Sequence, residues 1–253
     1  MAIQDSINRL MSSTFGSLTA IKGVEELKKN NQNKITGDYL NSKKQEQLLR
    51  EKASYITEPN VESQVNQLGK ITNSNIKAKS NVDKINDLKD ESNKLKVESK
   101  DLMNKSVTDN NIESMQNIIK SKELEDEAYK KLDKADKYFK GAEQQLGNSS
   151  SEKKVFQDMT SSIAKELRPI MFEKMTQTLL QDSIKSGRGV VSLDQVLELE
   201  EQIDNMSPIE LIKQALNNSD SSKEYESSLN KYDESEKDLT NTIIKLYDKT
   251  KGD

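Results

Sequence analysis

The sequence predicts an all-α protein, an elongated helical bundle of coiled-coil-like antiparallel helices that includes one kinked apolar helix. Two observations lead to this prediction. Apolar residues recur at steps of three and four over long stretches, which is the helical period. Only 32% of the 253 residues are apolar and 4% aromatic, whereas 32% are charged. An average globular domain is nearer half apolar, so we expect each helix to bury one narrow stripe.

Residues 1–27 are predicted to be an amphipathic N-terminal docking segment. Within the first 21 residues only Asp5 and Arg9 are charged. The segment lacks the basic start and unbroken apolar run of a secretory signal. We expect it to dock on the body or on a neighbouring subunit. Insertion into a membrane surface is the weaker alternative, because the polar face lacks the Lys and Arg that such helices favour. The apolar side chains predicted to make the contact are Ile3, Ile7, Leu10, Phe15 and Leu18.

Residues 28–57 are predicted to be a polar linker, because they hold clusters of Asn, Gly and Lys with little apolar periodicity. Residues 58–147 are predicted to form a long helical hairpin. Pro59 fits the first turn of its first helix, where the missing N–H is not needed. The sequence 108–111 breaks the pattern and supplies the turn. Two long helices joined by a short turn favour an antiparallel pair.

The two arms of this hairpin differ in their predicted seams. In the first arm Ser92 and Ser99 occupy heptad positions where apolar residues are expected, so the seam is thin. The second arm is better patterned and ends at Gly147, a C-cap glycine. Its predicted seam is Ile112, Met115, Ile119, Ala128, Leu132, Ala135, Phe139, Ala142 and Leu146.

Residues 148–217 are predicted to hold the apolar kinked helix and two short helices. Ser149 and Glu152 have the spacing of a capping box and start the apolar helix. Pro169 is expected to kink it, because proline removes a backbone hydrogen bond. Gly187 ends it. The short helices at about 193–204 and 208–217 follow capping boxes that begin at Ser192 and Ser207. Residues 218–253 complete the chain with a heptad helix interrupted only by Glu236.

The apolar helix is also where the sequence places a subunit interface. It carries the most apolar stretch of a polar chain, and methionines suit adaptable contacts. The alternative is that these side chains fill a core. The residues assigned to this interaction surface are Leu167, Ile170, Met171, Met175 and Leu179.

Composition argues against an enzyme. The chain has no Cys and no His, which removes thiolate nucleophiles and the usual general base near neutral pH. Paired carboxylates such as Glu200 and Glu201 are adjacent, so they do not share a helix face. Residues 187–189 read Gly-Arg-Gly but lack the spacing of a phosphate-binding loop. We predict no catalytic residue, no metal site and no cofactor.

The charge is unevenly distributed along the chain, but neither half is strongly basic. Residues 1–107 carry 18 Lys and Arg against 14 Asp and Glu, whereas residues 108–253 carry 21 against 29. Opposite halves could attract each other, within a chain or between copies, but solvated helix faces are the simpler interpretation. A dedicated nucleic-acid binder has a denser basic surface, so contact with nucleic acid is open but has no support in the sequence.

The amphipathic start MAIQDSINRLMSSTFGSL, followed by a helical body rich in Lys, Asn, Ser and Glu, resembles virion proteins of tailed bacteriophages. The resemblance is to internal or ejection-type proteins and head–tail components of crAss-like phages. It implies a structural, non-enzymatic protein that is assembled in many copies in the host cytoplasm and incorporated in the virion. Its implied partners are its own copies and other virion proteins. A phage scaffolding or assembly adaptor, or a secreted helical toxin or adhesin, are the alternatives.

Overall fold

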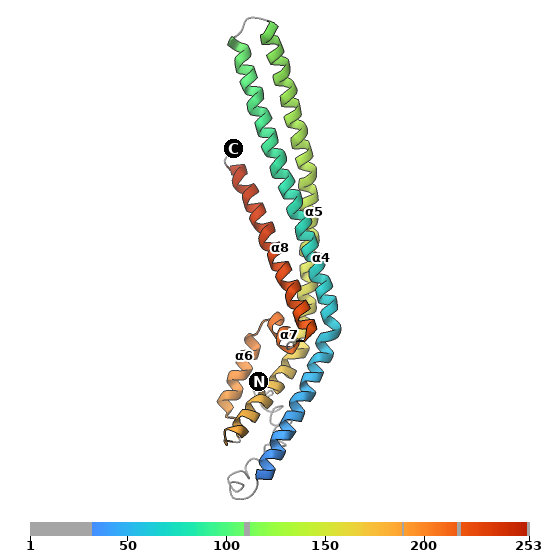
Figure 1. Ribbon diagram of the computed structural model, residues 1–253, viewed down its shortest axis with the longest axis vertical. Helices are drawn as coiled ribbons and strands as arrows, with labels where there is room; N and C mark the ends of the chain where they lie inside the picture. The colour runs from blue at the N-terminus through green and yellow to red at the C-terminus, as the bar shows by residue number, and fades with distance from the viewer. Residues whose placement is uncertain (1–31, 109–111, 189, 217–218, 252–253) are drawn as a thin grey trace, which may run out of the picture. The chain divides into compact units, whose positions relative to one another are not determined.

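The computed structural model describes residues 32–108, 112–188, 190–216 and 219–251, and these residues form five helices and no strand (Figure 1). The predicted all-α class is therefore confirmed. The helices are α4 (Gln32–Thr108), α5 (Ile112–Lys185), α6 (Leu193–Asn205), α7 (Pro208–Leu216) and α8 (Asp220–Lys251). The N-terminal docking segment 1–27 lies outside the described residues.

The chain divides into two compact units, and α4 and α5 contribute to both. Unit 1 takes the described residues up to Val61 together with Met159–Ser222. Unit 2 takes Glu62–Asp158 together with the residues from Lys223 onward. Each unit is therefore built from segments that are far apart in the sequence, and each is described by itself below.

The predicted linker 28–57 is wrong for residues 32–57, which are helical, and Pro59 lies inside α4 instead of starting a helix. Contacts with α5 stabilise this stretch within unit 1. Ser42 Oγ donates a hydrogen bond to Gln177 Oε1 (2.9 Å), and Gln181 Nε2 donates one to Glu46 Oε2 (2.8 Å). Helix packing thus overrides a weak apolar pattern, as it often does for polar helices.

The predicted end of a helix at Gly147 and the predicted cap at Ser149 are also wrong, because α5 continues through both residues. Ser149 is buried, and its hydroxyl donates to Asn75 Oδ1 of α4 at 2.7 Å. The Glu152 carboxylate accepts from Ser74 Oγ of α4 at 3.1 Å instead of capping a new helix. The two residues that resemble a capping box therefore join two helices.

The later boundaries agree with the prediction. Gly187 has a φ of +73°, and the Arg188 N–H donates to the Ser183 carbonyl at 3.0 Å, as in a Schellman motif. Ser192 and Gln195 form a complete capping box at α6. At α7 the Ser207 N–H donates to Glu210 Oε2 at 2.7 Å. Pro169 lies inside α5, and the kink assigned to it stays a prediction.

In unit 1 an arginine from α5 holds the end of α6. Arg168 Nη1 donates to the carbonyl oxygens of Ile203 (2.9 Å) and Asp204 (3.0 Å), and Nη2 donates to that of Met206 (3.1 Å). Carbonyls at a helix C-terminus lack partners within the helix and carry partial negative charge. The guanidinium fork supplies both the hydrogen bonds and the opposite charge.

In unit 2, residues 62–108 of α4 and 112–158 of α5 run antiparallel and form a hairpin (Figure 1). A seam of small residues joins its two arms. Ser99 Oγ donates to the Ser121 carbonyl and Ser121 Oγ to the Ser99 carbonyl, both at 2.9 Å. Ser92 Oγ donates to the Ala128 carbonyl at 3.1 Å. The seam repeats every seven residues and consists of Ser92, Ser99 and Ser106 on α4 with Ser114, Ser121, Ala128, Ala135, Ala142 and Ser149 on α5.

This seam corrects the predicted one. Ile112, Met115 and Ile119 do not enter it and are 78%, 70% and 58% exposed. Phe139 is 47% and Leu146 37% exposed, whereas Ala135 and Ala142 are buried. A serine hydroxyl reaches the backbone of the facing helix only where the side chain opposite to it is small. The large residues therefore lie away from the line along which the two helices approach most closely.

Helix α8 packs on the lower part of the hairpin as a third helix of unit 2 (Figure 1). Asn75 Nδ2 of α4 donates to Ser235 Oγ of α8 at 3.2 Å, which extends the Ser149–Asn75 contact to a third helix. Glu236, which interrupts the apolar pattern of α8, pairs with Lys153 of α5. Lys249 near the end of α8 pairs with Asp90 at 2.6 Å.

Candidate interaction site

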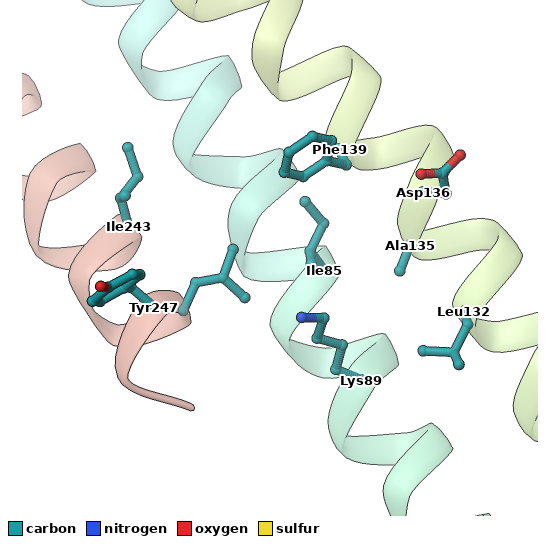
Figure 2. Close-up of a pocket in the computed structure, with 9 residues that line it drawn as sticks. Ile85, Lys89, Leu132, Ala135, Asp136, Phe139, Ile243 and Tyr247 are labelled. Carbon is teal, nitrogen blue, oxygen red and sulfur yellow. The ribbon is translucent and has the colours of Figure 1, made fainter. Parts of the chain in front are cut away.

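A groove opens where α4, α5 and α8 diverge in unit 2, and Figure 2 shows its walls. Its volume is about 410 Å³, within the usual range of ligand pockets. The walls are mostly apolar, with Lys89 of α4 and Asp136 of α5 as the two charged members. The apolar wall residues are Ile85, Leu132, Ala135, Phe139, Ile243, Leu246 and Tyr247.

A second apolar feature lies at the hairpin end, on the first turns of α5. Ile112, Met115 and Ile119 stand at positions i, i+3 and i+7, so they share one face of the helix. All three are more than half exposed, and Val107 at the end of α4 is 83% exposed. We call Ile112, Met115 and Ile119 the tip stripe. Contiguous exposed apolar side chains are typical of interaction surfaces.

Polar side chains from the middle of α8 and from α5 form a cluster that joins the two helices. Burial raises the pKa of Glu236, but hydrogen bonds from Lys153 and Tyr232 outweigh it and hold the pKa of this carboxyl below its ordinary value. Burial raises the pKa of Tyr232 well above its ordinary value, and the hydrogen bond to Glu236 adds to this. The carboxylate therefore stays ionised at neutral pH and links α5 to α8.

The predicted site residues fall into three groups. Ile3, Ile7, Leu10, Phe15 and Leu18 lie outside the described residues. Leu167 and Met171 are 0% and 2% exposed. This placement differs from the predicted interface, because a side chain with no exposed surface cannot meet a partner. Three residues are half-buried, and partner contacts through them stay a prediction: Ile170, Met175 and Leu179.

Within the part of the chain that the structure describes, no group of three or more acidic side chains is placed to hold a metal ion. No helix in the described ranges is long and apolar enough to cross a membrane.

Sequence reasoning missed both the groove and the tip stripe. It assigned the tip stripe and the groove residues Leu132, Ala135 and Phe139 to one seam, because steps of three and four fit them all. The signal that separates them is the strict seven-residue repeat of Ser and Ala from Ser114 to Ser149. Small residues in register mark the line of closest approach, and the large residues beside it mark the exposed faces.

No protein-family model matches the chain, and no curated protein or solved structure is significantly similar to it.

Proposed function

We propose that this chain is a structural, non-enzymatic phage virion protein that acts through multicopy assembly, as an internal or ejection-type protein or a component of a head–tail ring. The observation that carries the assembly part is the exposed apolar surface of unit 2. The tip stripe and the groove leave large aliphatic and aromatic side chains in contact with water. Burying such surface lowers the free energy by roughly 25 cal/mol per Å² of apolar area. Association with further subunits is therefore favoured.

The virion part of the proposal rests on the resemblance of the N-terminal segment and of the Lys-, Asn- and Ser-rich body to phage virion proteins. The construction of unit 2 is compatible with a structural role. Its helices are joined by buried serine contacts and ion pairs between helices, which fix their register. A phage scaffolding adaptor would use the same kind of surface, but it would leave before maturation.

A mass-spectrometric census of purified particles tests the virion part. We expect the chain in mature particles in many copies. Its presence in immature particles with loss on maturation would favour the scaffolding adaptor, and its absence from both would contradict the proposal.

Deletion of residues 1–27 tests whether the N-terminal segment docks the chain in the particle. We expect the helical content and melting of the remaining chain to be nearly unchanged, because a helix this short is marginal alone and is ordered by the surface it meets. Incorporation into the particle should be lost. Unfolding of the deleted protein would show instead that the segment belongs to the core.

A further inference from the structure

We propose that α8 opens from the hairpin of unit 2 while the two arms of the hairpin stay joined. The inference goes beyond the proposed function and does not depend on it, because it concerns the helices of unit 2 alone. Local opening is expected where a helix has few buried apolar side chains and is held by exposed contacts. Helix α8 combines loose packing at its C-terminal end, exposed ion pairs and an unpaired polar atom in its buried face.

The C-terminal turns of α8 pack loosely on the hairpin. Thr242 is buried, but among residues 243–249, whose side chains the structure describes, none is buried. Ile243, Ile244 and Tyr247 are 37%, 50% and 57% exposed. The groove of about 410 Å³ lies between this end of α8 and the hairpin (Figure 2). Separating the end of α8 therefore exposes little apolar surface that is not already in contact with water.

Ion pairs between partly exposed side chains link α8 to the hairpin. Lys249 pairs with Asp90 at 2.6 Å, and both side chains are 50% exposed. Lys153 pairs with Glu236, and these side chains are 31% and 40% exposed. Exposed ion pairs contribute little to stability and are screened by salt. The arms of the hairpin are joined differently, by buried serine hydroxyls that donate to backbone carbonyls. Helix α8 should therefore separate more readily than the two arms do.

The buried face of α8 carries an unpaired polar atom near its start. Tyr225 is 0% exposed, and its hydroxyl has no hydrogen-bond partner among the described residues. The contacts between α4 and α8 join residues 160 and 159 positions apart, so the two helices run parallel. Tyr225 follows the unpaired Gln64 by 161 positions and lies at the same level. Unpaired buried polar groups are unfavourable, and opening of α8 lets water bind the Tyr225 hydroxyl.

Thiol labelling of single-cysteine variants of the full-length protein tests the opening, because the chain has no Cys of its own. Leu229→Cys and Thr242→Cys place reporters in the buried face of α8, at residues that are 6% and 7% exposed. Ser92→Cys, at a buried residue of the hairpin seam, is the matched control. Circular dichroism checks the helical content of each variant. The reaction rate with the uncharged reagent dithiodipyridine is measured at low and high salt.

We expect both reporters on α8 to react at least about tenfold faster than Ser92→Cys, which corresponds to about 1.4 kcal/mol. High salt should speed the α8 reporters by about two- to threefold and leave Ser92→Cys unchanged, because it screens the ion pairs. Tyr225→Phe, added to Thr242→Cys, should slow labelling about fivefold, since the closed state no longer buries an unpaired hydroxyl. Tyr129→Phe, at an exposed tyrosine of α5, is its control and should leave the rate unchanged.

Other results overturn the inference. Equal rates for the α8 reporters and Ser92→Cys would show that unit 2 opens as a whole. Rapid labelling of Thr242→Cys with slow labelling of Leu229→Cys would show that only the last turns of α8 fray. Hydrogen exchange of the unmodified protein shows whether a substitution itself loosened α8. Faster exchange across α8 than in residues 62–88 of α4 would support the opening, and equally slow exchange would contradict it.

Discussion

Unit 1 and the hairpin of unit 2 both use α4 and α5, yet unit 1 and the distal part of the hairpin bury side chains of different size. In unit 1 the fully buried side chains include large aliphatic ones, among them Leu167 and Met171 of α5 and Leu211 and Ile212 of α7. In the distal part of the hairpin, residues 88–108 and 112–132, the buried residues are serines and one alanine. The part of the hairpin nearer Glu62 also buries Leu68, Ile71, Val82 and Ile85. Helix α5 therefore buries large aliphatic side chains in unit 1 and small side chains in the distal part of the hairpin.

This difference determines which large apolar side chains each region leaves exposed for contact with a partner. A volume-filled core hides its large residues, so unit 1 presents few of them along α5. In the distal part of the hairpin, residues 88–108 and 112–132, the seam buries no large side chain, so the large apolar residues there lie on the outer faces. Gly141 illustrates how closely the hairpin packs, because a Cβ there would lie 3.0 Å from Asn81 Nδ2. Because small residues occupy the distal seam, the large apolar residues Ile112, Met115 and Ile119 remain exposed at the tip.

Removing volume from unit 1 should have the largest effect. Leu167→Ala should lower the free energy of unfolding by about 2–5 kcal/mol, because a fully buried leucine leaves a cavity. Urea denaturation followed by circular dichroism measures it. Tyr55→Ala, at a residue that is 82% exposed, should change stability by less than about 0.5 kcal/mol. A loss below about 1 kcal/mol for Leu167→Ala would remove the contrast between the two regions.

Adding volume to the hairpin seam should come next. Ala128→Leu should cost about 1–3 kcal/mol, because the side chain is fully buried and Ser92 Oγ bonds to the Ala128 carbonyl across the seam. The same denaturation experiment measures it. Tyr129→Leu, at the exposed neighbouring position, is the control and should be nearly neutral. If Ala128→Leu stabilises the protein, the helices do not approach as closely as described.

The hydrogen bonds from Arg168 to the end of α6 test whether unit 1 also depends on polar contacts. Arg168→Ala should cost about 1–2 kcal/mol, because three backbone carbonyl oxygens lose a charged donor. Arg168→Lys keeps the charge but not the fork, and should recover only part of this loss. Thermal melting with hydrogen exchange of α6 distinguishes local from global effects. Full recovery with lysine would mean that charge alone matters.

One buried polar residue of unit 2 should act in the opposite direction. Gln64 is 0% exposed, and neither amide atom has a hydrogen-bond partner among the described residues. Gln64→Leu should therefore raise stability by about 1 kcal/mol, because an unpaired buried amide is unfavourable. The midpoint of urea unfolding reports the change. A destabilised variant would show that the amide is needed at this buried position.

The smallest effect should be a change in pH dependence. Burial raises the pKa of Glu46, but hydrogen bonds from Gln181 and Arg50 and the charges of Arg50 and Lys174 outweigh it and lower the pKa below 4.5. A lowered pKa stabilises the folded state above the unfolded-state pKa, and this contribution disappears as the pH falls through the folded-state value. Glu46→Gln should therefore lose less stability than the wild type between about pH 7 and pH 3. Equal losses would contradict this contribution.

Much of the local structure could be predicted from the sequence. The caps at Ser192, Ser207 and Gly187 depend on residues within one or two turns, so their patterns were sufficient. The all-α class follows from periodicity that is also local. The break at 108–111 agrees with the end of α4 at Thr108 and the start of α5 at Ile112.

What the tertiary structure alone decided is how residues far apart in the sequence use their side chains. Ser149 looks like a cap, but it is a buried contact because Asn75 lies opposite to it. Residues 32–57 look like a linker, but they are helical because α5 supplies the facing surface. The tip stripe looks like a seam because spacing cannot tell which of two apolar faces meets the partner helix. Local sequence sets where helices can form and end, whereas the pairing of distant helices determines which faces are buried and which remain for a partner.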